Sequence, residues 1–131
     1  MCALYTNELL TLSRFARDNA YAPYSGFSVG AAILFSNGQM HAGVNVENAS
    51  YGLTNCAERS ALFTGITAGC LRIDQVAISA QNKHGELLST FMPCGACRQV
   101  LAEFGHRDTL VIVDGAGTFL LSDLLPHAFQ I

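Results

Sequence analysis

Two short cysteine-containing segments constrain the fold of this chain more than any other feature of its sequence. Cys56 is followed two residues later by Glu58, and Cys94 and Cys97 form a Cys-X-X-Cys pair directly after Pro93. Both segments stand where a helix is expected to begin, and the positive end of a helix dipole lowers the pKa of a thiol. Three thiolates can share one cation only if these two distant helix starts point at the same place, so the fold must bring them together.

The number and type of these ligands indicate the kind of site. Three protein ligands with an open fourth position are typical of catalytic zinc, whereas structural zinc is usually closed by four. Side chains two residues apart on a helix point about 200° apart, so Cys56 and Glu58 can face one metal only if Cys56 is the cap. We therefore predict a helix that begins at Cys56 or one residue to either side, with Cys56, Cys94 and Cys97 as Zn²⁺ ligands. Glu58, beside the metal but not bound to it, is suited to carry protons.

Other interpretations of the cysteine pair stay open at this point. Arg59 and Arg98 are available to moderate the charge of three thiolates, but a Cys-X-X-Cys pair is also typical of zinc knuckles and redox proteins. A zinc module without chemistry leaves Glu58 unexplained. A thiol-redox protein requires a disulfide between Cys94 and Cys97.

The sequence near the N-terminus predicts a cytoplasmic location, in which the five cysteines are expected to be reduced. The chain has five cysteines, an odd number, and charged residues at Glu8, Arg14 and Arg17 interrupt the apolar stretch that a signal peptide needs. Such a set is typical of metal-binding or catalytic thiols rather than of a disulfide framework, so we expect a cytoplasmic location. Cys2 and Cys70 lack ligand-like spacing and are expected to take no part in the site.

Composition limits the possible partners. Half of the 131 residues are hydrophobic, 13% are charged, and the formal net charge is −3. A domain this small has too much surface to bury that many apolar side chains, so we expect an oligomer, the alternative being a monomer with an apolar surface. No segment is rich in Lys and Arg, which argues against a nucleic-acid polymer and for a base or nucleoside as the ligand. No apolar run approaches the roughly 20 residues of a membrane span.

Hydrophobic periodicity predicts a single domain over residues 1–131 of the α/β class. The expected arrangement is a three-layer α/β/α fold with a mixed five-stranded sheet, because helices alternate with short apolar strands around one hairpin. Helices are predicted over residues 6–19, 57–67 and 93–104, with Pro93 at the first position of the third and a final helical turn near Leu124. Strands are predicted over residues 27–35, 40–46, 76–80, 110–113 and 118–121, with Asn37-Gly38 as a hairpin turn.

Several segments together resemble a known family. They lie at residues 21–25, 27–32, 45–51, 56–59, 93–99 and 124–126, and the zinc signature of nucleobase deaminases, Cys-X-Glu followed by Pro-Cys-X-X-Cys, is among them. Over nearly its whole length the chain is similar to the small, homotetrameric type of cytidine deaminase. The resemblance implies one Zn²⁺ per subunit and hydrolysis of cytidine and deoxycytidine to uridine and deoxyuridine plus ammonia, a reaction of pyrimidine salvage. Blasticidin deaminases carry a similar motif set, but Asn45, Glu47 and Arg59 favour the cytidine type.

The same resemblance implies a role for each site residue, which the residues alone do not establish. Cys56, Cys94 and Cys97 hold zinc; Glu58 moves protons between water, ring nitrogen 3 and the departing amine; Arg59 bonds the ligand thiolates; Asn45 and Glu47 bind the ribose hydroxyls; Phe27 packs on the nucleoside; the backbone of Ala57 contacts the base; and Tyr51 and Phe129 lie near a neighbouring subunit's site. Alternatively, Asn45 and Asn48 stabilise turns, and Phe27 and Phe129 pack in a core. The family commonly has Gly where this chain has His127, which affects how Phe129 is delivered.

Overall fold

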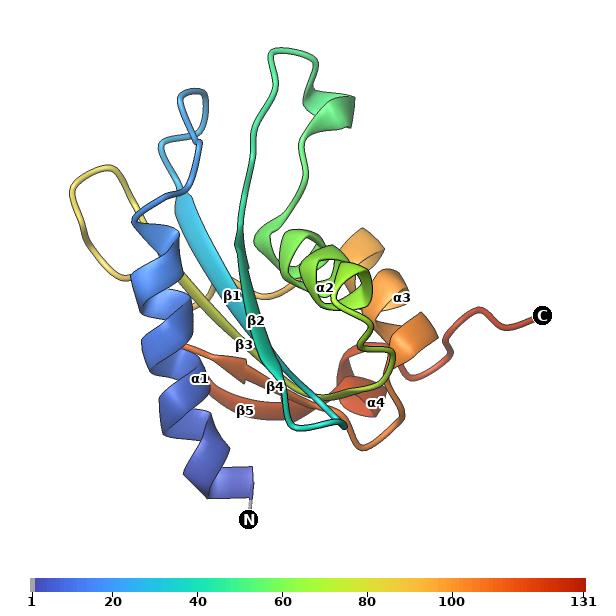
Figure 1. Ribbon diagram of the computed structural model, residues 1–131. Helices are drawn as coiled ribbons and strands as arrows, with labels where there is room; N and C mark the ends of the chain where they lie inside the picture. Colours follow the sequence, from blue (N-terminus) through green and yellow to red (C-terminus); the bar gives the residue numbers. More distant parts are fainter. Residues whose placement is uncertain (1) are drawn as a thin grey trace.

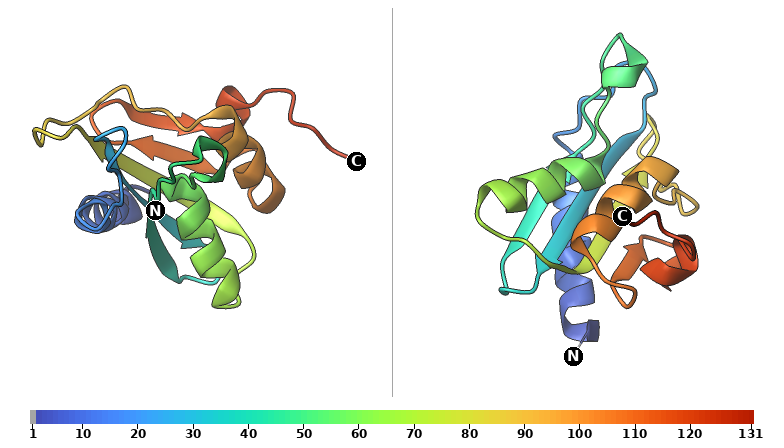
Figure 2. Two further views of the ribbon diagram at one scale, coloured as in Figure 1. Left: turned by 90° about the horizontal axis from the view of Figure 1, so that it is seen from above. Right: turned by 90° about the vertical axis from the view of Figure 1, so that its right-hand side faces the viewer.

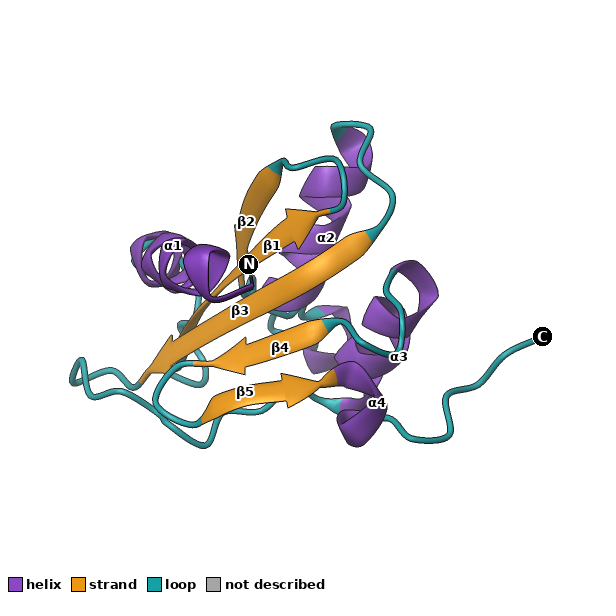
Figure 3. Cartoon of the chain, turned by 90° about the horizontal axis from the view of Figure 1, so that it is seen from below, coloured by secondary structure: helices purple, strands orange, loops and turns teal. Residues whose placement is uncertain are grey.

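A mixed five-stranded sheet forms the centre of the fold in the computed structural model, which describes residues 2–131 and the side chains from Tyr5 onward. Its strands are β1 (Ser28–Phe35), β2 (Met40–Val44), β3 (Ile73–Gln81), β4 (Leu110–Val113) and β5 (Gly117–Leu120), arranged in the order β2-β1-β3-β4-β5. β1 pairs antiparallel with β2 and β3, β3 pairs parallel with β4, and β4 pairs antiparallel with β5. The predicted sheet is therefore confirmed (Figure 3).

Helices cover both faces of this sheet (Figure 1). α1 (Cys2–Arg17) lies against β1 and β3 on one face. α2 (Ala57–Thr67) and α3 (Gly95–Phe104) lie side by side on the other, as the views in Figure 2 also show. The predicted three-layer α/β/α arrangement is confirmed, and two short helices complete it, η1 (Tyr51–Leu53) and α4 (Leu121–Leu124). Within residues 2–131 the structure has no helix long and apolar enough to cross a membrane.

The central strands are buried on both faces, which explains their nearly continuous apolar sequence. Val76 and Ile78 of β3 pack on the α2 and α3 side, whereas Ala77 between them packs with Leu9 of α1. Close approach of α2 to the sheet requires a glycine at position 43, where a Cβ atom would lie 2.2 Å from the backbone nitrogen of Ala61. This contact fixes the height of α2 over the sheet, and therefore the position of the residues at its start.

Several predicted boundaries are wrong, and the first helix, predicted over residues 6–19, spans Cys2–Arg17. The helix expected to start at Pro93 starts at Gly95, because Cys94 adopts an extended backbone (φ −69°, ψ 170°) and caps the helix with its sulfur, which accepts a hydrogen bond from the Cys97 backbone. β3 extends beyond the predicted residues 76–80 at both ends, since the polar residue Gln75 pairs with β1 as the apolar ones do. The turn between β1 and β2 is confirmed at Gly38, whose φ is +89°.

An ion cluster centred on Asp114 fastens α1 to the sheet. Arg14 donates to both carboxylate oxygens of Asp114, at 2.8 and 2.7 Å, and Ser79 of β3 donates to one of them at 2.6 Å. Arg17 lies 3.8 Å from the same carboxylate. The hydrogen bonds from Arg14, with those from Ser79 and the charge of Arg17, lower the pKa of Asp114 even though its burial acts in the opposite direction.

Asp114→Asn is expected to lower the free energy of unfolding at pH 7 by about 2 kcal/mol, because charged hydrogen bonds at a buried oxygen are lost. Since the folded pKa lies below the unfolded value, the stabilisation is complete above the unfolded pKa of about 3.9 and disappears as the pH falls through the folded pKa. Urea unfolding of both proteins across this pH range measures the difference. The exposed neighbour Asp18 provides the control as Asp18→Asn, and equal stability of Asp114→Asn and the wild type at pH 7 would contradict the assignment.

Candidate active site

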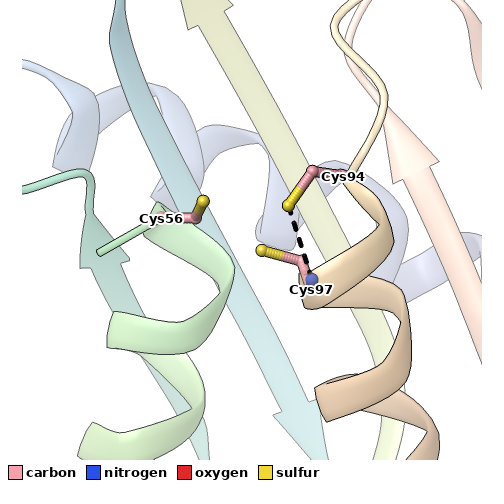
Figure 4. Close-up of side chains that lie close together, drawn as sticks. All are labelled: Cys56, Cys94 and Cys97. Carbon is pink, nitrogen blue, oxygen red and sulfur yellow. Dashed lines mark hydrogen bonds between the residues drawn. The ribbon is translucent and has the colours of Figure 1, made fainter. Parts of the chain in front are cut away.

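The starts of α2 and α3 bring three thiols together, as predicted. Cys56 and Cys94 are the N-caps of the two helices, each with extended backbone, and Cys97 lies in the first turn of α3. Their sulfur atoms all lie within 4.8 Å of one another (Figure 4). Among the described residues this is the single group of three or more Cys, His, Asp or Glu side chains close enough to hold a metal ion.

The donor set fits Zn²⁺. Thiolates are soft ligands that suit this ion, and sulfurs about 2.3 Å from a tetrahedral zinc lie about 3.8 Å apart, within the spacing that the three thiols already have. The thiol of Cys97 lowers the pKa of Cys56 to about 5, and Arg59 adds to this because its Nη2 donates to the Cys56 sulfur at 3.3 Å. In turn, the hydrogen bond to Cys56 and burial raise the pKa of Cys97. Negative charge is therefore concentrated on the Cys56 sulfur, which Arg59 contacts and which a bound cation would neutralise.

Only one of the two arginines contacts the thiols. Arg59 bonds Cys56, whereas Arg98 donates from Nε to the Pro93 carbonyl and from Nη1 to the Leu124 carbonyl, both at 2.8 Å. The expectation that Arg98 moderates the thiolate charge is therefore wrong. Pro93 directly precedes the cap Cys94, and Arg98 is the fourth residue of the helix. These two positions lie next to each other at a helix start, so the Arg98 side chain reaches the Pro93 carbonyl. Arg98 instead braces the loop that presents Cys94.

Glu58 lies next to the thiols, at the start of α2. It is the second residue of α2 and is 3% exposed, so Cys56 occupies the cap and Glu58 the first turn, as predicted. Burial, with a contribution from the charge of Cys56, raises the pKa of Glu58 to about 7. A carboxyl group with a pKa near neutrality can both accept and release a proton, which is what a general acid and base must do.

A cavity of about 260 Å³ opens beside Glu58 and two of the thiols. Its walls combine apolar and polar side chains, namely Ser25, Phe27, Val29, Asn45, Glu47, Thr54, Cys56, Ala57, Glu58, Phe91, Met92 and Cys94. A larger hollow of about 380 Å³ between α3, α4 and the C-terminal tail contains none of the predicted site residues. The two thiols and the carboxyl therefore face the smaller cavity, whose apolar walls with a few polar groups are typical of a small-molecule site.

The two predicted ribose contacts, Asn45 and Glu47, both line this cavity and also hold its wall. Glu47 accepts hydrogen bonds from the Ser25 hydroxyl and from the backbone nitrogens of Tyr24 and Ser25, the last two at 3.0 Å. Burial acts to raise the pKa of Glu47, but these hydrogen bonds hold it below its usual value. The residue therefore presents a carboxylate to the cavity.

The Asn45 amide braces the start of β1. Its Oδ1 accepts from the Val29 backbone nitrogen at 2.9 Å, and its Nδ2 donates to the Phe27 carbonyl at 2.8 Å. Asn48, by contrast, accepts from the Ser50 backbone nitrogen at 2.9 Å within its own turn. The turn-stabilising alternative thus describes Asn48, while Asn45 holds the backbone of Phe27 and the start of β1.

Aromatic side chains form one wall of the cavity. Phe27 is 43% exposed and meets Phe91 edge to face, with ring centroids 6.3 Å apart. Phe27 therefore lines the cavity, and the core-packing alternative is wrong for it. Phe91 and Met92 also line the cavity and were not predicted, although their place directly before Pro93 and Cys94 was a signal for them.

Tyr51 and Phe129 do not line this cavity within the chain, although Tyr51 lines a neighbouring hollow that shares Ser25, Glu47 and Thr54 with it. Tyr51, in η1, is 75% exposed and packs edge to face on Tyr24 at 6.2 Å. Phe129, in the tail that extends past α3 in Figure 1, is 72% exposed, so the core-packing alternative is wrong for it too. His127 is exposed and makes no hydrogen bond or ion pair with the described residues.

Ala57 and Cys70 are both buried, the first beside the cavity and the second away from the thiols. Ala57 is fully buried at the first position of α2, with its backbone beside the cavity. Cys70 is buried outside the thiol cluster and donates to Gln39 at 3.2 Å. The side chain of Cys2 lies outside the described residues.

Comparison with known proteins gives one consistent family. Residues 5–113 match the family model described as the cytidine and deoxycytidylate deaminase zinc-binding region. Cytidine deaminase of Halalkalibacterium halodurans is 47% identical over 118 residues, which cover 87% of this chain and 86% of that protein. The structure of cytidine deaminase from Burkholderia pseudomallei superposes with a TM-score of 0.83 at 41% identity, covering 94% of this chain and 98% of the other. That from Mycobacterium tuberculosis gives a TM-score of 0.81 at 42% identity, covering 95% and 97%.

Proposed function

This chain belongs to the cytidine and deoxycytidylate deaminase family, and from that membership we propose that it hydrolyses cytidine and deoxycytidine to uridine and deoxyuridine with release of ammonia. The observation that carries the proposal is the meeting of three thiols and the Glu58 carboxyl at one small cavity. We propose that residues 1–131 form one catalytic domain acting in pyrimidine salvage. The free thiols that the site needs favour a cytoplasmic location.

The proton transfers fall to Glu58. Zn²⁺ bound by Cys56, Cys94 and Cys97 supplies Lewis-acid activation of water. The Glu58 carboxylate accepts a proton from the attacking water and delivers it to ring nitrogen 3 as the new C–O bond forms at carbon 4. Glu58 then passes the second proton of the water to the exocyclic amine, the C–N bond breaks, and ammonia leaves. Its pKa of about 7 supports this alternation between acid and base.

The walls of the cavity support a nucleoside as the ligand. The Phe27 and Phe91 rings offer an apolar surface for a flat base, and Arg59 holds the Cys56 thiolate in place. The carboxylate of Glu47 and the amide of Asn45 supply the acceptors and donors that a sugar diol needs. Both residues can bond a hydroxyl as well. Among the described residues, Glu47 Oε2 accepts a single hydrogen bond, from Ser25, and the Asn45 amide accepts one and donates one, so each has capacity for another.

Glu47→Ala is expected to raise the KM for cytidine at least about tenfold, since a charged hydrogen bond to the ribose is lost. The same variant should change the KM for 2′,3′-dideoxycytidine little, because that nucleoside lacks both hydroxyls. Steady-state kinetics with the two substrates separates this role from the support that Glu47 gives to residues 24 and 25. An equal loss with both nucleosides would contradict a ribose contact.

We propose further that the protein is a homotetramer whose active sites are shared between subunits. The exposed aromatic side chains of Phe15, Tyr51 and Phe129 support a buried interface, and the last two support shared sites because neither reaches the cavity of its own chain. The tetramer itself rests on the family resemblance. Light scattering after size-exclusion chromatography tests this, and a particle of one chain, 14.0 kDa, would contradict it.

The substrate is tested by following the ultraviolet absorbance of cytidine with zinc-loaded protein, beside a parallel reaction with blasticidin. Conversion of cytidine to uridine supports the proposal. Turnover of blasticidin alone would instead identify the chain as a blasticidin deaminase. Asn45 and Glu47, as proposed ribose contacts, argue against that outcome.

A further inference from the structure

One side chain holds the C-terminal tail to the body of the protein. Nε2 of Gln99 donates to the Phe129 carbonyl at 3.2 Å, and the Phe129 backbone nitrogen donates to Gln99 Oε1 at 3.4 Å. Within the part of the chain that the structure describes, no other hydrogen bond, from backbone or side chain, reaches residues 126–131. The tail is therefore fixed at a single residue.

The residue held in this way carries an exposed aromatic ring. Phe129 has an exposed fraction of 72%, although burial of a Phe side chain is favourable. A free tail would gain by turning this ring onto the apolar surface, whereas a backbone held on both sides keeps the ring outward. A carboxamide is suited to the task, because its NH₂ group can donate to the C=O and its oxygen can accept from the N–H of one residue.

The two hydrogen bonds between Gln99 and Phe129, here called the clamp, start from a helix that is itself held in place. Gln99 lies on α3, whose start carries Cys94 as its cap and Cys97 in its first turn, and whose fourth residue, Arg98, is tied to the loop before it. The helix that holds two of the metal ligands of one subunit therefore also sets the position of Phe129. His127 takes no part in these bonds, so its replacement of the family's glycine leaves the clamp intact.

We propose that Gln99 is a positioning residue that presents the Phe129 ring to the nucleoside site of an adjoining subunit. This rests on the proposed function and on the shared sites proposed with it. Gln99 does not line the catalytic cavity, and it acts on the substrate only through Phe129. Its contribution thus concerns binding of the nucleoside and its orientation rather than the proton transfers at Glu58.

A double-mutant cycle on the full-length, zinc-loaded protein tests the proposal. Gln99→Met keeps the length of the side chain without either hydrogen bond, and it is expected to lower kcat/KM for cytidine about tenfold, mainly through KM. Gln99→Glu keeps the acceptor and should lie between Gln99→Met and the wild type. Combined with Phe129→Ala, Gln99→Met should cause no further loss, because both changes remove the same contact. Additive losses, or wild-type kinetics of Gln99→Met, would overturn the proposal.

A second measurement separates this proposal from the proposed reaction. Hydrogen exchange at the Phe129 amide should become faster in Gln99→Met, with zinc content and oligomeric state unchanged. Gln130→Met, which removes a neighbouring amide without a hydrogen bond to the described residues, should leave exchange at the wild-type rate. Unchanged exchange in Gln99→Met refutes the clamp even if cytidine is turned over. Faster exchange without any turnover of cytidine supports the clamp while the proposed function fails.

Discussion

Glu58→Gln is expected to lower kcat for cytidine by about 10³-fold or more while one zinc ion per chain is retained. Gln has nearly the same shape as Glu but cannot accept or release a proton, and general acid and base catalysis contributes about 10²–10⁴-fold. Here one carboxyl transfers a proton first to ring nitrogen 3 and then to the exocyclic amine. The loss of rate should therefore lie in the upper part of that range. The expected defect lies in kcat, because the cavity wall is unchanged.

The measurement is steady-state turnover of cytidine by the two proteins, with zinc determined by atomic emission. Glu103→Gln, the same substitution at an exposed position of α3, serves as the control and should keep wild-type turnover. Turnover by Glu58→Gln within tenfold of the wild type would refute the role given to the carboxyl. Loss of zinc from that variant would show instead that Glu58 supports the metal site.

Cys97→Ala is expected to abolish both zinc binding and turnover. Cys97 is fully buried, and without its sulfur only Cys56 and Cys94 remain as ligands in the cluster. Zinc bound to the folded state alone stabilises it by about 4 kcal/mol at a concentration 1,000 times the dissociation constant. Wild-type protein should therefore melt at a higher temperature with zinc than after chelation, whereas Cys97→Ala should melt at the same temperature in both.

The control for this prediction is Cys70→Ala. Cys70 is also buried, but its hydrogen bonds run to Asn37 and Gln39 and it lies outside the cluster. Its variant should lose some stability from the cavity it creates, yet bind one zinc per chain and keep its activity. One zinc per chain in Cys97→Ala, or loss of zinc in Cys70→Ala, would contradict the ligand set.

The sequence by itself determined the features that depend on a few neighbouring residues. The spacing of Cys56 and Glu58 is compatible with one shared site only if a helix begins between them, and α2 begins at Ala57. The Cys-X-X-Cys spacing likewise places Cys97 one turn from the cap of α3. The short apolar runs located every strand of the sheet, because the hydrophobic pattern that favours a strand lies within a few consecutive residues. The start of α3 was misjudged, since Pro93 favours the first helical position but lies before the cap, and the hydrogen bond to the Cys94 sulfur makes Cys94 the cap.

Only the tertiary structure decided which distant groups meet. Arg98 has the same charge as Arg59 and lies as close in sequence to a ligand, yet it bonds the carbonyls of Pro93 and Leu124 and not a thiol. Gln99 and Phe129 are thirty residues apart and meet because the chain turns back after α4. No local rule predicts such pairs, because their energies depend on where packing of the sheet places each segment, whereas capping and periodicity act within one or two turns of the chain.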